Sequence, residues 1–260
     1  MGAPSMPDFI KVDALDVITR LGGMRTEDAR FLAAYIATFT AKDVERAEKA
    51  KMIDVFDRPT SWTLNSLWVK TASKDEAEPT AVVYFREGGG TPAWRYLMPE
   101  VEGGARSLKS HERRLIRAGV MHAGEFAVPG PGVKLDGHGN IPGSTIELIL
   151  SQVSAAEQFA GYQANATQKS LRTRRRKGLG RYFYLRPDAA VPRLARAVAP
   201  GIYYRAGAKD IVPVILFVRA PRYQKRFPFH EVAKATADAV TWKHAQAGFE
   251  KYVLPKMQKA

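Results

Sequence analysis

The chain has 260 residues, of which 45% are hydrophobic and 25% charged, so it can bury a substantial core and has the composition of an ordinary globular protein. It contains no cysteine, which excludes disulfides, thiolate nucleophiles and cysteine-ligated zinc or iron–sulfur centres. The formal net charge is +14, and the whole excess lies in the second half: residues 1–130 hold 18 basic and 18 acidic side chains, and residues 131–260 hold 22 and 8.

This charge asymmetry favours a polyanionic neighbour, either nucleic acid or an acidic protein surface. The alternative is a basic face that only keeps the protein in solution. No apolar run approaches the roughly 20 residues that span a bilayer, and the first residues lack the basic and apolar regions of a signal peptide. We therefore expect a soluble protein that is made in a cytoplasm and has no membrane partner.

The first long element is predicted as a helix from Thr26 to about Phe56. Thr26 is a candidate N-cap, acidic residues occupy the first turn, and apolar residues follow at three- and four-residue spacing. From residue 41 on, the pattern fits a second helix as well as an extension of the first. Residues 1–25 are ambiguous between a short helix and a strand.

Two strands follow, from Leu64 to Thr71 and from Thr80 to Glu87, and the polar residues between them suit a hairpin loop. The glycines at 88–90 have no lysine in register for a phosphate-binding loop, so they are interpreted as a flexible connection. Residues 103–120 are predicted as a helix with Gly119 after its end. Another helix is expected from Ser144, a candidate N-cap.

Residues 125–143 are rich in proline and glycine and are predicted as an extended loop, which is often a binding element. Asp136 to Asn140 faintly resemble a calcium loop, but no bidentate Glu follows at the right distance, so a tight turn explains them better. The candidate protein-interface residues of this loop are Val128, Pro129, Pro131, Val133, Leu135, His138 and Ile141.

A second extended loop is expected at 163–181, and its basic residues are candidates for contact with nucleic acid or an acidic partner. They are Lys169, Arg172, Arg174, Arg175, Arg176, Lys177 and Arg181. Such a run neutralises phosphates without reading sequence, and Tyr182 and Tyr184 in the strand that follows are spaced to stack on bases. The other interpretation is a solvated loop, because charge runs usually face water.

Strands are also predicted at 181–185, 201–207 and 211–220, the last two as an antiparallel pair with Ile211 to Val218 in the centre of the sheet. A C-terminal helix is expected over residues 227–257, with Pro228 near its first turn. The predicted fold class is α+β, with mainly antiparallel strand units packed by long helices and long Pro/Gly-rich loops. The expected division is a helical region, 1–57, and an α+β domain, 58–260.

No pattern of a catalytic or metal site is present. The five histidines are spaced unlike metal ligands, no GxSxG occurs, and no paired carboxylates stand out for acid–base chemistry. The sequence therefore predicts a protein that is not an enzyme and has no cofactor or metal.

Five phrases are distinctive when taken together. They are VFDRPTSWTLNSLWVK, GTPAWRYLMPEVEGGARSLKSHERRLIRAGV, EFAVPGPGVKLDGHGNIPGSTIELILS, GYQANATQKS and PVILFVRAPRYQKRFPFHEVAKATAD. From about Val55 to Asp238 the chain resembles structural proteins from the head–tail modules of tailed bacteriophages, loosely akin to the minor tail protein Z group and to neck and tail-completion proteins. The most specific phrases begin at Phe56 and Lys225; the first fifty residues have no match.

The resemblance implies a non-enzymatic virion component, assembled in host cytoplasm as a multimeric ring in the neck, head–tail connector or tail. The implied partners are copies of itself and other virion proteins, namely portal, adaptor or tail proteins, with packaged DNA as a further contact. A free, sequence-independent DNA-binding protein that uses residues 169–181 is the alternative.

Overall fold

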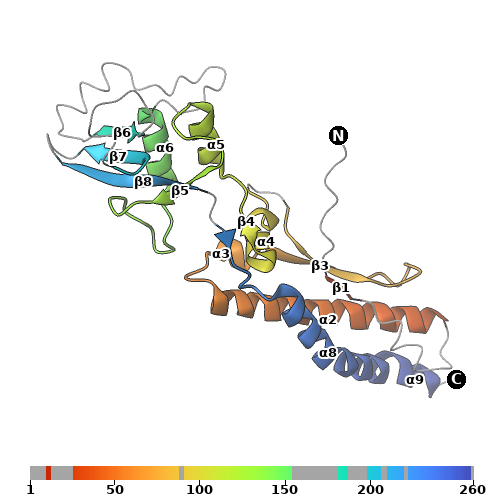
Figure 1. Cartoon of the computed structure of the whole chain (residues 1–260). Coiled ribbons are helices and arrows are strands. Elements are labelled where there is room, and N and C mark those ends of the chain that lie inside the picture. The colour runs from red at the N-terminus through yellow and green to blue at the C-terminus, as the bar shows by residue number, and fades with distance from the viewer. Residues whose placement is uncertain are drawn as a thin grey trace. The chain divides into compact units, whose positions relative to one another are not determined.

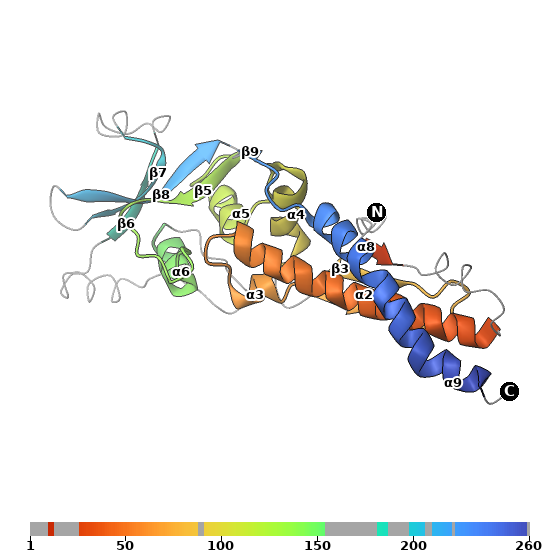
Figure 2. The same ribbon diagram turned by 90° about the horizontal axis from the view of Figure 1, so that it is seen from below.

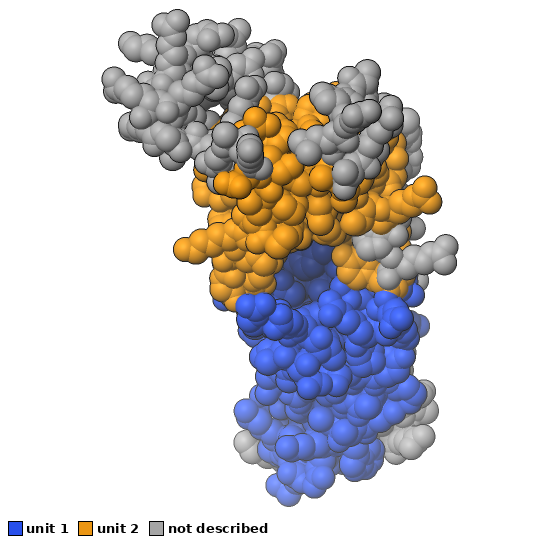
Figure 3. Space-filling view, turned by 60° about the vertical axis from the view of Figure 1, so that its left-hand side comes forward, with its two compact units in different colours: residues 1–103, 224–260 blue, residues 104–223 orange. Residues whose placement is uncertain are grey.

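The computed structural model describes residues 10–12, 26–87, 91–153, 181–186, 198–205, 210–219 and 222–258. The chain forms two compact units, coloured separately in Figure 3: unit 1 comprises residues 1–103 and 224–260, and unit 2 comprises residues 104–223. This division differs from the expected boundary at residue 57, because the N-terminal and C-terminal helices share one unit. Helices and antiparallel sheets together confirm the α+β class.

Unit 1 is built on two long helices, α2 (Thr26–Val55) and α8 (Phe229–Gly248), which lie side by side in Figures 1 and 2. The 30 residues of α2 are continuous, which decides against a second helix, and about 1.5 Å of rise per residue makes it about 45 Å long. It ends before Arg58, whose φ is +47°. The predicted C-terminal helix is confirmed, and it continues through a π-helical turn, η2 (Phe249–Val253), into α9 (Leu254–Met257).

A three-stranded antiparallel sheet completes unit 1, in the order β1-β3-β2. The strands are β1 (Ile10–Val12), β2 (Leu67–Lys70) and β3 (Ala81–Phe85). The predicted hairpin is therefore confirmed, but its first strand begins at Leu67 rather than Leu64. The preceding residues form a short helix, α3 (Ser61–Leu64), because Thr60 Oγ1 accepts a hydrogen bond from the Thr63 N–H at 3.1 Å and caps it.

The core of unit 1 joins residues that are far apart in the sequence. Alternate side chains of β3 are buried beneath α2, and α4 (Trp94–Glu102), which the sequence reasoning missed, adds Leu97 and Val101. The Phe229 ring stacks on Phe85 at 5.2 Å between centroids, and Phe227 meets Phe56 at 5.6 Å.

Unit 2 is built on a four-stranded antiparallel sheet in the order β5-β8-β7-β6. Its strands are β5 (Glu125–Pro129), β6 (Arg181–Leu185), β7 (Gly201–Arg205) and β8 (Ile211–Arg219). The predicted pairing of β7 with β8 and the interior place of β8 are confirmed. The register shifts between Ile202 and Tyr203, beside Pro213, which has no N–H to donate. A separate two-stranded ladder joins β4 (Gly104–Ala105) to β9 (Arg222–Tyr223).

Two helices, α5 (Ser110–Arg117) and α6 (Gly143–Gln152), pack against this sheet through Leu115, Ile149 and Leu150. The helix predicted at 103–120 was too long at its start, since residues 104–105 form β4. Gly119 does follow its end with φ +69°. The N-cap of α6 is Pro142, so the prediction of Ser144 as the cap was wrong.

Candidate functional site

The basic segment predicted to contact an anionic partner lies outside the described residues. This applies to Lys169, Arg172, Arg174, Arg175, Arg176 and Lys177; Arg181 is the first residue of β6. The two tyrosines after it differ in environment. The ring of Tyr182 packs against Tyr204 at 5.1 Å between centroids, whereas Tyr184 is 43% exposed. Of these two rings, only that of Tyr184 is largely open to solvent.

The expected interface loop is shorter than predicted, because Val128 and Pro129 belong to β5. The residues after the strand are fixed to β8: the N–H groups of Gly130 and Gly132 donate to the carbonyls of Val214 and Pro213, both at 2.9 Å. The prediction that residues 125–143 form one extended loop was therefore wrong at its start, where backbone pairing holds the chain in the sheet.

The candidate interface residues do not form one exposed surface. Val133 and Ile141 are half-buried and pack against the core of unit 2, while Pro131, Leu135 and His138 are exposed. Asp136 closes the turn between them, since its Oδ1 accepts the N–H groups of His138 and Asn140, each at 2.9 Å. These are the bonds of the tight turn that the residue types predicted.

Unit 2 contains a buried ion pair that the sequence reasoning did not find. Glu112 is fully buried, and its carboxylate meets the Arg106 guanidinium at 2.5 and 2.7 Å. The same carboxylate accepts the N–H groups of Lys109 at 2.6 Å and Ala127 at 2.8 Å. Burial alone would raise the pKa of Glu112, but these four donors hold it below its ordinary value.

A buried arginine follows β6. Arg186 is 6% exposed, donates to Glu125 at 2.8 and 3.1 Å, and contacts Nδ1 of His122 at 2.7 Å. The Arg186 guanidinium lowers the pKa of Glu125. Burial acts in the opposite direction, but its effect is smaller. Part of the positive charge of the second half is therefore structural.

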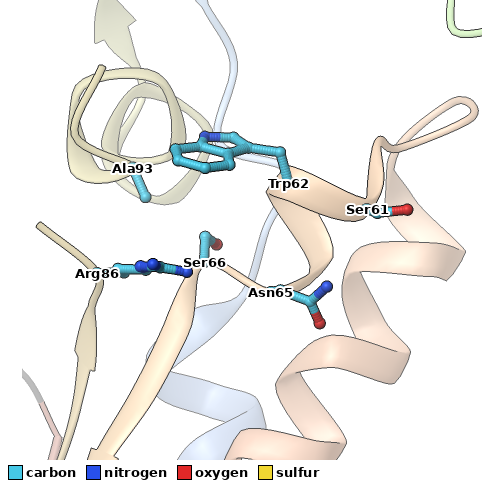
Figure 4. A pocket seen from close by; sticks show the side chains of 6 residues that line it. All are labelled: Ser61, Trp62, Asn65, Ser66, Arg86 and Ala93. Atoms are coloured by element: carbon cyan, nitrogen blue, oxygen red, sulfur yellow. The ribbon is translucent and has the colours of Figure 1, made fainter. Parts of the chain in front are cut away.

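Unit 1 contains a pocket where the two strands of the hairpin meet their flanking helices. Its volume is about 260 Å³, and its lining residues are Ser61, Trp62, Asn65, Ser66, Arg86 and Ala93. The local fold sets this geometry, since Ser66 precedes β2, Arg86 follows β3, and the Arg86 N–H donates to the Ser66 carbonyl at 2.7 Å. Figure 4 shows the Trp62 indole reaching toward Ala93, with Arg86 and Ser66 on the opposite side.

The guanidinium of Arg86 lies close to two indole rings, 5.8 Å from the centroid of Trp62 and 5.0 Å from that of Trp68. The two rings are 45% and 49% exposed. Cation–π attraction holds the guanidinium in place without neutralising it. The sequence signal for this arrangement was weak, because Trp68 fits the predicted strand from Leu64 to Thr71 and Trp62 stands just before it.

Two further groups of unit 1 are titratable, one between its two long helices and one within α2. His244 Nε2 lies 2.6 Å from Asp43 Oδ2 between α8 and α2, with no nucleophile in that contact. Glu48 is fully buried in α2, where burial raises its pKa to about 9 and the nearby Glu231 carboxylate adds to the rise. Within the described ranges, no three His, Asp or Glu side chains are grouped to hold a metal ion.

No protein-family model matches the chain, and no curated protein or solved structure is similar to it. None of the helices in the described part of the chain has the length and apolar character of a membrane span. The functional argument therefore depends on the residues themselves.

Proposed function

We propose that this protein is a structural subunit of a tailed-bacteriophage virion, assembled as a ring of copies in the neck, head–tail connector or tail. The observation that carries the proposal is the sequence resemblance from Val55 to Asp238. Its two most specific phrases, at 56–62 and 225–233, converge in unit 1, where the Phe56 ring contacts both Phe227 and the guanidinium of Arg226. Phe227 belongs to the core of unit 1 and Phe56 packs against it, so both phrases contribute to the architecture of the unit.

The distribution of charge between the units supports an assembly role beside a polyanion. Unit 2 holds 20 basic and 7 acidic residues, a net charge of +13, whereas unit 1 holds 20 and 19, a net charge of +1. In a ring, every copy contributes this charge, so weak contacts with DNA or an acidic neighbouring protein add up. Because unit 1 has almost no net charge, we expect its contacts in the assembly not to depend on a polyanion.

The test is cryo-electron microscopy of purified virions from the phage or prophage that encodes the chain, with symmetry relaxed at the portal vertex. The expected result is a ring of copies of this chain in the neck, connector or tail. Complete virions that lack the chain would refute the proposal.

Sequence-independent DNA binding by the free protein is the second candidate, favoured by the charge of +13 on unit 2. It predicts that the isolated protein binds duplex DNA of any sequence, with an affinity that falls steeply as salt rises. A salt titration by fluorescence anisotropy measures this. Flat salt dependence, or no binding at low salt, would eliminate it.

A further inference from the structure

The pocket of unit 1 contains a cation for which the described residues supply no acid. No carboxylate of the described ranges lies within ion-pair distance of Arg86, and none of the six lining residues is acidic. Other arginines of the protein do have acidic partners: Arg58, Arg106, Arg114, Arg186 and Arg226. Among the described residues, Arg86 is therefore a guanidinium held by aromatic rings and without an acidic partner.

Two further polar groups of the pocket offer donors. Ser66 is only 2% exposed, and its Oγ, which lies near the Tyr96 hydroxyl, makes no well-formed hydrogen bond in the described part of the chain. The Asn65 Oδ1 accepts a hydrogen bond from Lys49 Nζ at 2.7 Å, which leaves the amide N–H₂ of Asn65 to donate. A guanidinium from Arg86, a hydroxyl from Ser66 and an amide from Asn65 thus contribute to the lining of one small space.

The volume limits what this space admits. At about 260 Å³ it is smaller than the roughly 300–1,000 Å³ of sites for drug-sized ligands, so it fits a group the size of a side chain. The indole of Trp62 and the methyl group of Ala93 supply an apolar wall beside the donors. The matching ligand is a planar anion on a short apolar stem.

We propose that this pocket binds the carboxylate of an acidic peptide segment of a partner protein, with an adjoining apolar side chain against Trp62. A carboxylate matches the fork of a guanidinium in a bidentate, charge-assisted pair. Nucleic acid is the less suitable occupant, because unit 1 has a net charge of only +1 and polyanion binding needs several cations. This inference goes beyond the virion role and is tested on the isolated protein.

The probes are two short peptides, acetyl-Leu-Glu-Leu-amide and its isostere acetyl-Leu-Gln-Leu-amide. The chain has four tryptophans, so ¹⁵N-labelled indoles give four NMR signals, which single Trp→Phe variants assign. We expect the Glu peptide to shift the signals of Trp62 and Trp68 and to leave Trp242, on α8, unchanged. We expect the Gln peptide to bind at least about tenfold more weakly, because it lacks the charge.

Arg86→Gln is expected to abolish the shift, and Arg86→Lys to weaken it, since lysine keeps the charge but loses the fork. The matched control is Arg95→Gln, because Arg95 also stacks on a tryptophan, Trp94, at 5.3 Å but does not line the pocket. An unchanged Trp242 signal in each variant shows that unit 1 is folded. If the two peptides bind equally, if Arg86→Gln binds as the wild type does, or if neither peptide binds, the proposal is wrong. It is also overturned if oligo-dT competes for the same two signals more strongly than the Glu peptide.

Discussion

In the part of the chain that the structure describes, each unit buries one glutamate completely, and the pKa values of the two are shifted in opposite directions. Glu112 in unit 2 is surrounded by the Arg106 guanidinium and two backbone N–H groups, which lower its pKa. Glu48 in unit 1 makes no well-formed hydrogen bond in the described part of the chain, and its pKa is raised to about 9. Both side chains are 0% exposed.

The difference shows that burial alone does not determine whether a carboxyl group is charged. The hydrogen-bond donors around the group decide it. Desolvation acts to raise both pKa values, and in Glu112 four donors overcome it. Glu112 is therefore an anion on which unit 2 depends, and Glu48 is a neutral acid that unit 1 tolerates. The following predictions separate these two roles.

The largest effect is expected for Glu112→Gln. The substitution leaves the guanidinium of Arg106 largely buried without its counter-charge, and breaking such a pair costs about 3–5 kcal/mol of unfolding free energy. Hydrogen exchange of the β5 and β8 amides measures the stability of unit 2. The control is Glu147→Gln, because Glu147 also pairs with an arginine but is 59% exposed, and we expect a change within about 1 kcal/mol. Equal effects of the two substitutions would contradict this account.

Glu48→Gln is expected to stabilise unit 1, and only above pH 4.5. The folded state keeps a proton that the unfolded chain releases, so wild-type stability falls as pH rises from about 4.5 to about 9. The variant does not undergo this loss, because glutamine does not titrate. Its unfolding free energy should exceed that of the wild type by on the order of 3 kcal/mol at pH 7 and should equal it at pH 4. All four tryptophans lie in unit 1, so urea unfolding followed by their fluorescence reports on it. Stability curves of wild type and variant that run parallel from pH 4 to 8 would show that Glu48 is charged in the folded state.

A smaller difference in stability is expected between alanine substitutions of one glycine in each unit. A Cβ on Gly130 would lie 2.5 Å from the Pro213 carbonyl oxygen, which is backbone, and one on Gly248 would lie 2.7 Å from Leu32 Cδ1, the end of a side chain. Overpacking costs about 1–3 kcal/mol, and a side chain yields more readily than a paired strand. Gly130→Ala should therefore destabilise unit 2 more than Gly248→Ala destabilises unit 1. Thermal unfolding of both variants measures the order, and the reverse order would mean that the sheet yields more easily than the helix pair.

The smallest effect on stability is expected for the triple change of Arg174, Arg175 and Arg176 to Ser. We predicted these residues to lie in a solvated loop, so the unfolding free energy should change by no more than about 0.5 kcal/mol per substitution. Affinity for duplex DNA or an acidic protein should fall. Changing Lys42, Lys243 and Lys251 of unit 1 to Ser removes the same charge elsewhere and is the control. If both triple variants lose the same affinity, total charge matters and the segment does not.

The sequence predicted those elements whose signal is local. The continuous apolar run from Ile211 to Val218 identified an interior strand, and the three- and four-residue spacing after Thr26 identified α2. It did not predict α4, which contains Pro99 and follows three glycines. The prediction of Ser144 as the N-cap was wrong because α6 begins earlier, directly after Pro142.

The candidate sites were harder to predict, because they depend on residues that are distant in the sequence. Arg186 and its partner Glu125 are 61 positions apart, and Arg86 joins Trp62 across the hairpin. A run of arginines stands out in a sequence, but a single arginine that folding brings close to two indoles does not. The surroundings of Arg86 in the pocket could therefore be recognised only from the folded structure.

The chain order of the two units has a consequence for biosynthesis. Residues 104–223 leave the ribosome before residues 224–260, which carry Phe227, Phe229 and all of α8. Unit 2 therefore has its complete sequence while unit 1 still lacks one of its two long helices, and the hydrophobic side of α2 stays uncovered until α8 arrives. Domains fold as units during synthesis, so unit 1 closes only after unit 2 has emerged. A chain that stops early leaves unit 1 open, and such a chain exposes apolar surface to chaperones and proteases instead of entering an assembly.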